Sequence, residues 1–173
     1  MRRVLELGRA GGAGTGKGVR PVLREGVVVA TLRAAHWKEA ATAVVEDREW
    51  VFAKARRELT GRWAADPEGT ARLRARQTSS WRGTWEVDLE GTPVQAEVAS
   101  RWRGGHRYRS AGRVVAETGT TGGWSRRPTL TADESLPLDH QVYLLWLALV
   151  MSRRDEAATV AAVAGGAAAA GGS

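Results

Sequence analysis

Hydrophobic and polar residues alternate along much of the chain, in short stretches that turn residues separate. In the segment 71–76, Ala71, Leu73 and Ala75 alternate with three arginines, and the segment 81–89 alternates in the same way. Because successive side chains of a strand point to opposite faces, this period predicts strands with one buried face. We expect eleven strands, with at most one more between 119 and 137, at residues 3–7, 19–24, 27–34, 42–46, 50–56, 58–64, 71–76, 81–89, 93–100, 105–110 and 113–118.

The alternation gives way to ten consecutive apolar residues, from Val142 to Met151. Successive helical residues turn by about 100°, so this run would cover every face of a helix, and such a helix must be buried on all sides. At about 1.5 Å per residue the run spans roughly 15 Å, about half the hydrocarbon thickness of a membrane. With Asp139 as the N-cap and Arg153 and Arg154 in the last turn, we predict a core helix over 139–154. A membrane anchor is the alternative interpretation.

A helix that is apolar on all sides restricts the architecture. A β-sandwich has no place for it, whereas a closed barrel of about twelve strands has a lumen that its own side chains cannot fill. Small residues expected on the inward face would leave room for the helix: Gly61, Ala71, Ala75, Gly83 and Ala96. We therefore predict a mainly β protein, a closed antiparallel barrel with a central hydrophobic C-terminal helix. Residues 1–154 form one domain, and the Ala/Gly-rich tail 155–173 is expected to be disordered.

The chain has eight tryptophans but only one phenylalanine and two tyrosines. They are spread along the sequence at Trp37, Trp50, Trp63, Trp81, Trp85, Trp102, Trp124 and Trp146. This spacing predicts about one large ring per strand, filling the interior of the barrel. It fits a platform for stacking bases less well, because those rings would cluster.

Composition limits the possible chemistry. The chain has no cysteine, which excludes disulfides, thiolate metal sites and a cysteine nucleophile. Its net charge of +7 and pI near 10.9 favour anionic partners, a phospholipid surface or nucleic acid. The alternative is a coding bias toward G and C, because only Lys17, Lys38 and Lys54 among the 26 basic residues are lysines. The first residues, MRRVLELGRAGG, contain no apolar signal region, so we expect a cytoplasmic protein.

Known catalytic and cofactor motifs are poorly matched. The segment Gly11 to Gly18, GGAGTGKG, nearly matches a phosphate-binding loop, but Gly18 replaces its hydroxyl residue and Pro21 interrupts the helix that should follow. We interpret it as a hairpin loop. His36, His106 and His140 lack ligand spacing, and neither G-x-S-x-G nor H-E-x-x-H occurs. We predict no enzymatic activity, no cofactor and no metal.

With these elements the chain resembles the tubby-like superfamily, which includes the LURP-one-related proteins and the phospholipid scramblases. The features shared are the order of elements, the Trp-bearing strands and the segment SLPLDHQVYLLWLALVMSRR, and they cover residues 1–154. The resemblance implies a twelve-stranded barrel threaded by its C-terminal helix, and binding of phosphoinositide headgroups at a membrane. The chain lacks the cysteine-rich palmitoylation segment of scramblases and has no acidic loop beside the helix that resembles a calcium site, so scrambling is not implied.

The leading hypothesis is a non-catalytic barrel, peripheral to the membrane and without a transmembrane segment, that binds anionic phospholipid headgroups. A nucleic-acid-binding protein is the second hypothesis, and an enzyme is the third. Guanidinium forks suit phosphate groups. The candidate anion-binding residues are Arg72, Arg74, Arg76, Arg101, Arg103, Arg107 and Arg109. The alternative is an ordinary solvated exterior, on which Glu86, Asp88 and Glu97 pair with these arginines.

Overall fold

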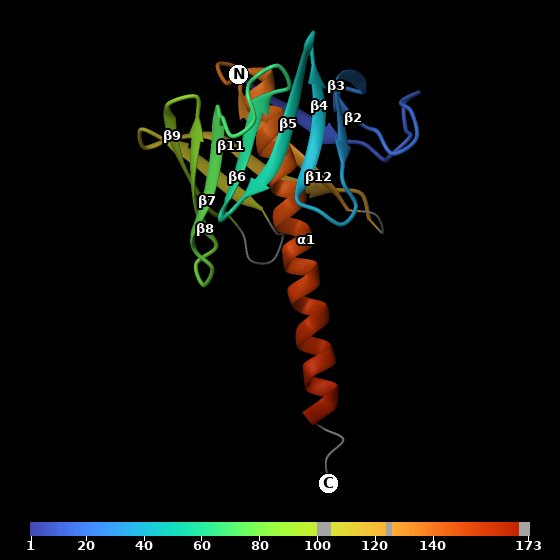
Figure 1. Cartoon of the computed structure of the whole chain (residues 1–173), viewed down its shortest axis with the longest axis vertical. Helices are drawn as coiled ribbons and strands as arrows, with labels where there is room; N and C mark the ends of the chain where they lie inside the picture. Colours follow the sequence, from blue (N-terminus) through green and yellow to red (C-terminus); the bar gives the residue numbers. More distant parts are fainter. Residues whose placement is uncertain (100–104, 124–125, 170–173) are drawn as a thin grey trace.

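The chain forms a closed antiparallel barrel of twelve strands followed by one helix, α1 (Figure 1). The structure is a computed structural model that describes residues 1–99, 105–123 and 126–169, with side chains described as far as Val163. Each strand pairs with the next along the chain, and β1 closes the barrel against β12. The predicted fold class is therefore confirmed. The strands are β1 (Arg2–Leu7), β2 (Arg20–Arg24), β3 (Val27–Ala34), β4 (Ala40–Val45), β5 (Arg48–Ala55), β6 (Glu58–Trp63), β7 (Leu73–Ser79), β8 (Thr84–Leu89), β9 (Thr92–Val98), β10 (His106–Ser110), β11 (Arg113–Thr121) and β12 (Arg127–Asp133).

The alternation in the sequence becomes the inside and the outside of the barrel. On β7, Leu73 and Ala75 are fully buried, whereas Arg74 and Arg76 are exposed. The closing pair follows the same rule, since Leu5 of β1 lies opposite Leu130 of β12 and both are fully buried. A slip of one residue in any pair would bring charged residues into the core, so the pattern sets the register.

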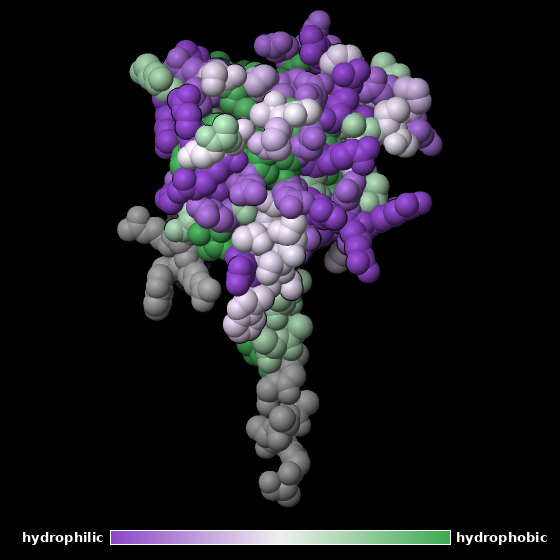
Figure 2. All heavy atoms as spheres, turned by 90° about the vertical axis from the view of Figure 1, so that its left-hand side faces the viewer, coloured by the Kyte–Doolittle hydropathy of each residue, from purple (hydrophilic) through white to green (hydrophobic). Residues whose placement is uncertain are grey.

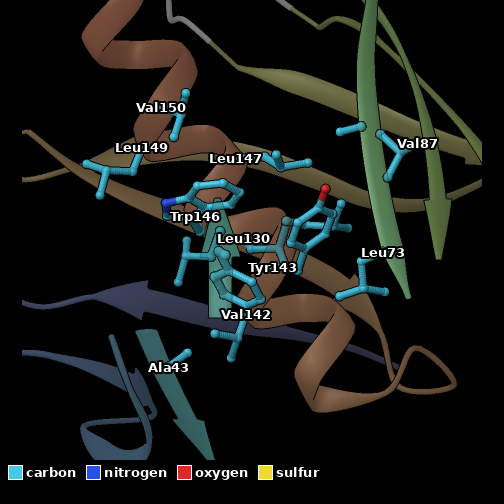
Figure 3. Close-up of a cluster of buried hydrophobic side chains, with 14 of the residues drawn as sticks. Ala43, Leu73, Val87, Leu130, Val142, Tyr143, Trp146, Leu147, Leu149 and Val150 are labelled. Atoms are coloured by element: carbon cyan, nitrogen blue, oxygen red, sulfur yellow. The ribbon is translucent and has the colours of Figure 1, made fainter. Parts of the chain in front are cut away.

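The helix α1 (Leu138–Ala169) runs through the lumen and continues beyond the barrel (Figure 1). Its residues from Val142 to Leu147 are almost completely buried. In Figure 3, side chains of several strands surround this part of α1. Phe52 of β5 lies against it, with ring centroids 5.3 Å from Tyr143 and 5.2 Å from Trp146. Beside Phe52, a Cβ on Gly61 would lie only 3.1 Å from the Phe52 ring, so this glycine provides room for the aromatic cluster.

The helix differs from the prediction at both ends. It begins at Leu138, one residue earlier than predicted, and the Gln141 N–H donates to the Pro137 carbonyl oxygen. Asp139 lies in the first turn, where its carboxylate accepts from the His140 N–H. The predicted end near Arg154 is not observed, because α1 continues through the segment expected to be disordered as far as Ala169. Alanine has the highest helix propensity, and the buried part of α1 already supplies the nucleus.

Two tryptophans contradict the prediction that every ring fills the interior. Trp37 and Trp81 are each 90% exposed. Trp37 lies in the loop between β3 and β4, and β8 begins only at Thr84, so Trp81 and Gly83 belong to a turn. Gly83 has a φ of 63°, a left-handed value that interrupts the alternation predicted for 81–89. Trp102 and Trp124 lie outside the described residues.

The glycine-rich segment Gly11 to Gly18 is a loop between β1 and β2. It leads into a strand, so it lacks the helix N-terminus that a phosphate-binding loop requires. Of the small residues expected to make room for α1, Gly61, Ala75 and Ala96 are buried inside the barrel. Ala71 is half-buried and precedes β7.

Candidate functional site

The arginines predicted to bind an anion lie on the outer wall of the barrel, and most are ion-paired there. Strand pairing places β7 between β6 and β8, which bring carboxylates to both sides of Arg74 and Arg76. Arg74 Nη1 lies 3.0 Å from Glu58, and Arg76 Nη2 lies 2.8 Å from Glu86. Both pairs are about half exposed, and pairs of this kind contribute little to stability.

The predicted arginines of β10 are paired in the same way. Arg107 Nε lies 3.2 Å from Glu117, and Arg109 Nε lies 3.0 Å from Glu97. Asp88, which was expected to pair with an arginine, instead accepts the Gly91 N–H in the turn after β8. Arg101 and Arg103 lie outside the described residues.

A shallow groove of about 780 Å³ brings three of these arginines together on the outer wall. Arg74, Arg76 and Arg109 line it, but so do three carboxylates, Glu58, Glu86 and Asp88. Figure 2 shows this side of the molecule, where hydrophilic residues cover most of the barrel. The groove thus has balanced charge, and an anion would have to compete with carboxylates that are already in contact with the guanidinium groups.

Arg72 has a different environment, in the turn between β6 and β7. Its guanidinium stacks 3.4 Å above the Trp63 ring and lies 2.6 Å from Asp66. Glu90 approaches it at 3.4 Å. The hydrogen bond from Arg72 holds the pKa of Asp66 below its usual value, and Asp66 in turn raises the pKa of Arg72. Arg72 is therefore engaged by an aromatic ring and two carboxylates at this end of the barrel.

The topology also separates charge between the two ends of the barrel. In an up-and-down barrel, alternate turns lie at the same end. The turns at the end where α1 begins contain one arginine, Arg72, and we call this end the acidic end, although the adjoining strand ends also carry Arg3, Arg24, Arg48 and Arg113. Its carboxylates are Glu25, Glu46, Asp47, Asp66, Glu68, Glu90 and Glu134.

The turns at the opposite end, where α1 leaves the barrel, form the basic end. Their described residues include one carboxylate, Glu39, and it is occupied by Arg154 at 2.5 Å and Lys54 at 3.2 Å. Among the described residues, the cations of these turns are Arg9, Lys17, Lys38, Arg56, Arg57, Arg82 and Arg126.

Figure 1 shows α1 emerging at this end of the barrel, where the turns after β3, β5, β7 and β11 lie. We define the basic rim by their exposed cations and tryptophans, Trp37, Lys38, Arg56, Arg57, Trp81, Arg82 and Arg126. Within the described residues, none of the five cations forms an ion pair. The basic rim thus combines cations without partners and two exposed indole rings, whereas the described arginines of the predicted site are engaged by carboxylates.

Our reading of the sequence missed the basic rim, although the sequence contains a signal for it. The segments that form the turns, taken alternately, are acidic (EG, ED, ADPEGT) and basic (AHWKE, RR, SSWRG). Assigning these turns alternately to the two ends of an up-and-down barrel would have placed the cations at one end. The exposed Trp37 and Trp81 each precede a cation in these turns, which also distinguishes them from core tryptophans.

In the described part of the chain, no group of three or more histidine or acidic side chains is placed to hold a metal ion. None of the described helical segments is both long and apolar enough to cross a bilayer. Compared with known proteins, the chain matches no family model, no curated protein and no solved structure.

Proposed function

We propose that this protein is a non-catalytic barrel that docks on anionic phospholipid surfaces through its basic rim. The observation that carries the proposal is the separation of charge between the two ends of the barrel. An anionic surface would attract the basic end more strongly than the acidic end, so the barrel would bind in one orientation. We expect a cytoplasmic protein that is peripheral to the membrane.

The rim has both features of a membrane-facing surface. Each Lys or Arg near an anionic leaflet contributes about 1 kcal/mol of attraction, which is screened by salt. Indole rings prefer the level of the headgroups, with the ring among lipid and its N–H toward water. Trp37 next to Lys38, and Trp81 next to Arg82, present this combination on two separate turns. The paired arginines of the wall would contribute less, because their charge is already compensated.

The resemblance to the tubby-like superfamily supports the same proposal. A twelve-stranded barrel with a hydrophobic C-terminal helix is the architecture expected of that superfamily, and members of it bind lipid headgroups. The proposed binding surface differs from the wall arginines that the sequence suggested. It lies at the end of the barrel where the helix emerges.

Vesicle co-sedimentation tests the proposal. The wild type should bind vesicles of phosphatidylcholine with 30 per cent phosphatidylserine, on the order of the anionic content that attracts polybasic segments, and not pure phosphatidylcholine. A rim variant with Arg56→Gln, Arg57→Gln and Arg82→Gln should lose most of this binding. The matched wall variant, Arg74→Gln, Arg76→Gln and Arg109→Gln, removes the same charge and should bind nearly as well as the wild type.

Two results would overturn the proposal. Equal loss in the rim and wall variants would mean that only net charge matters. Binding of double-stranded DNA or RNA at the same salt concentration, without binding to anionic vesicles, would support a nucleic-acid-binding protein instead.

A further inference from the structure

Two arginines, Arg20 and Arg153, lie at the basic end of the barrel, near enough for the charge of Arg153 to act on Arg20. Arg20, the first residue of β2, lies opposite Leu32 of β3, and two residues further along Val22 lies opposite Ala30. Leu32, Val22 and Ala30 are buried in the core, so Arg20 is on the inward face of the barrel. Arg153 reaches the same end of the barrel from α1, where its Nη1 donates to the carbonyl oxygen of Ala35 at 2.9 Å.

Both guanidinium groups are half-buried, and neither has an acidic partner in the described part of the chain. The undescribed residues contain no Asp or Glu that could supply one. Arg20 makes one long hydrogen bond, 3.4 Å from its Nη1 to the Gly8 carbonyl oxygen. Burial, and then the charge of Arg153, lower the pKa of Arg20. Two like charges at a partly desolvated site therefore repel each other, and each retains unused N–H donors.

We propose that Arg20 and Arg153 form a binding site for a phosphate group. A phosphate offers several acceptor oxygens and a negative charge, and it would turn the repulsion between the two cations into two attractions. A free phosphate ester and the headgroup of a phospholipid share this chemistry. Binding of a free phosphate ester does not depend on the proposed function. Binding of a lipid headgroup rests on it, because docking through the basic rim would bring headgroups to the mouth of the barrel.

Thermal melting with inorganic phosphate at constant ionic strength tests the site in solution. The wild type should gain stability relative to chloride, with a rise in Tm of roughly 3 °C at about tenfold excess over Kd. Arg20→Gln and Arg153→Gln should abolish this response, and Arg74→Gln on the outer wall should leave it unchanged. Without phosphate, Arg20→Gln should melt at the same temperature as the wild type or higher, because it removes a repulsive charge. A purely structural role for Arg20 predicts a lower Tm instead.

Vesicles distinguish the two sources of phosphate. If the ligand is a headgroup, the wild type should prefer phosphatidic acid, with its exposed phosphomonoester, to phosphatidylglycerol at equal surface charge, and Arg20→Gln should lose only this preference. If the ligand is soluble, the phosphate response should appear without such a preference. Absence of both effects in the wild type, or a phosphate response that survives in Arg20→Gln and Arg153→Gln, would overturn the site. Loss of vesicle binding in the rim variant would still support docking in that case, so the two proposals can fail separately.

Discussion

The hydroxyl of Tyr143 in α1 donates a hydrogen bond of 2.6 Å to the carbonyl oxygen of Leu59 in β6. Both residues are almost completely buried, and burial raises the pKa of Tyr143 well above its usual value, so the hydroxyl keeps its proton. The bond joins the helix to the wall at residues 84 positions apart in the sequence. It is one of the contacts, with those of Arg153 and Arg154, that set the rotation of a helix whose apolar surface alone has no preferred face.

Replacing Tyr143 with Phe tests this bond. The variant should lose about 1 kcal/mol of unfolding free energy, because the Leu59 carbonyl oxygen loses this donor in a dry environment. Tyr108→Phe is the matched control. The Tyr108 hydroxyl is also buried, but it has no hydrogen-bond partner in the described part of the chain, so its removal should be neutral or stabilising. Urea denaturation of both variants measures the difference, and equal losses would show that the bond has no special role.

A charge inside the lumen should be far more damaging. Leu145→Asp places a carboxylate at a fully buried position of α1, and we expect a loss of several kcal/mol, enough to make the protein insoluble or molten. Val160→Asp, on the part of the same helix beyond the barrel, should be tolerated because Val160 is 69% exposed. Solubility and circular-dichroism melts check both. A fragment 1–138 that is soluble and melts cooperatively would contradict the role of α1 as the core of the barrel.

Arg72 illustrates why the sequence predicted the fold better than the site. Alternation along one strand was enough to place Arg72, Arg74 and Arg76 away from the core, and the apolar run was enough to require an enclosing barrel. The partners of these arginines come from other segments: Asp66 and Trp63 for Arg72, and Glu58 for Arg74. Such contacts depend on strand register and turn geometry, which one strand does not encode. The same holds for Arg20 and Arg153, which are 133 positions apart and come near each other only when the barrel closes around α1.

Arg72 and Arg74 should differ in how much they contribute to thermal stability, because Arg72 has more partners. Arg72→Gln should lower the Tm measurably, because it removes the stack on Trp63 and two carboxylate contacts together. Arg74→Gln should leave the Tm almost unchanged, since Arg74 is half exposed and has one partner. Differential scanning calorimetry at low and high salt separates the effects, because the stacking contribution should persist in salt. Equal Tm values for the two variants would contradict this expectation.

His106 should make stability depend on pH in the mildly acidic range. Burial at the start of β10 lowers its pKa below the usual value, although Asp155 and the Gly83 backbone oppose the shift. The unfolded chain, with a histidine pKa of about 6.5, then binds the proton more tightly than the folded protein does. Stability should therefore fall as the pH drops from about 6.5 toward the lower pKa of the folded state, and level off below it. His106→Gln should flatten this slope, whereas His36→Gln, at an exposed position, should not.

Trp37 and Trp81 provide a direct test of the orientation in which the barrel docks. In solution both indoles are 90% exposed, so acrylamide should quench them strongly. On vesicles containing phosphatidylserine, the rings should move into the headgroup region, which protects them from acrylamide and shifts their emission to the blue. Brominated lipids should then quench the wild type much more than a variant with Trp37→Phe and Trp81→Phe, which retains the buried Trp50, Trp85 and Trp146. The double variant should also bind the vesicles several-fold more weakly, because each indole adds burial in the interface to the attraction of the rim cations. If the wild type binds vesicles while acrylamide quenching stays as high as in solution, another face contacts the lipid, and the charge-balanced wall of β7 and β8 would be the surface to examine next.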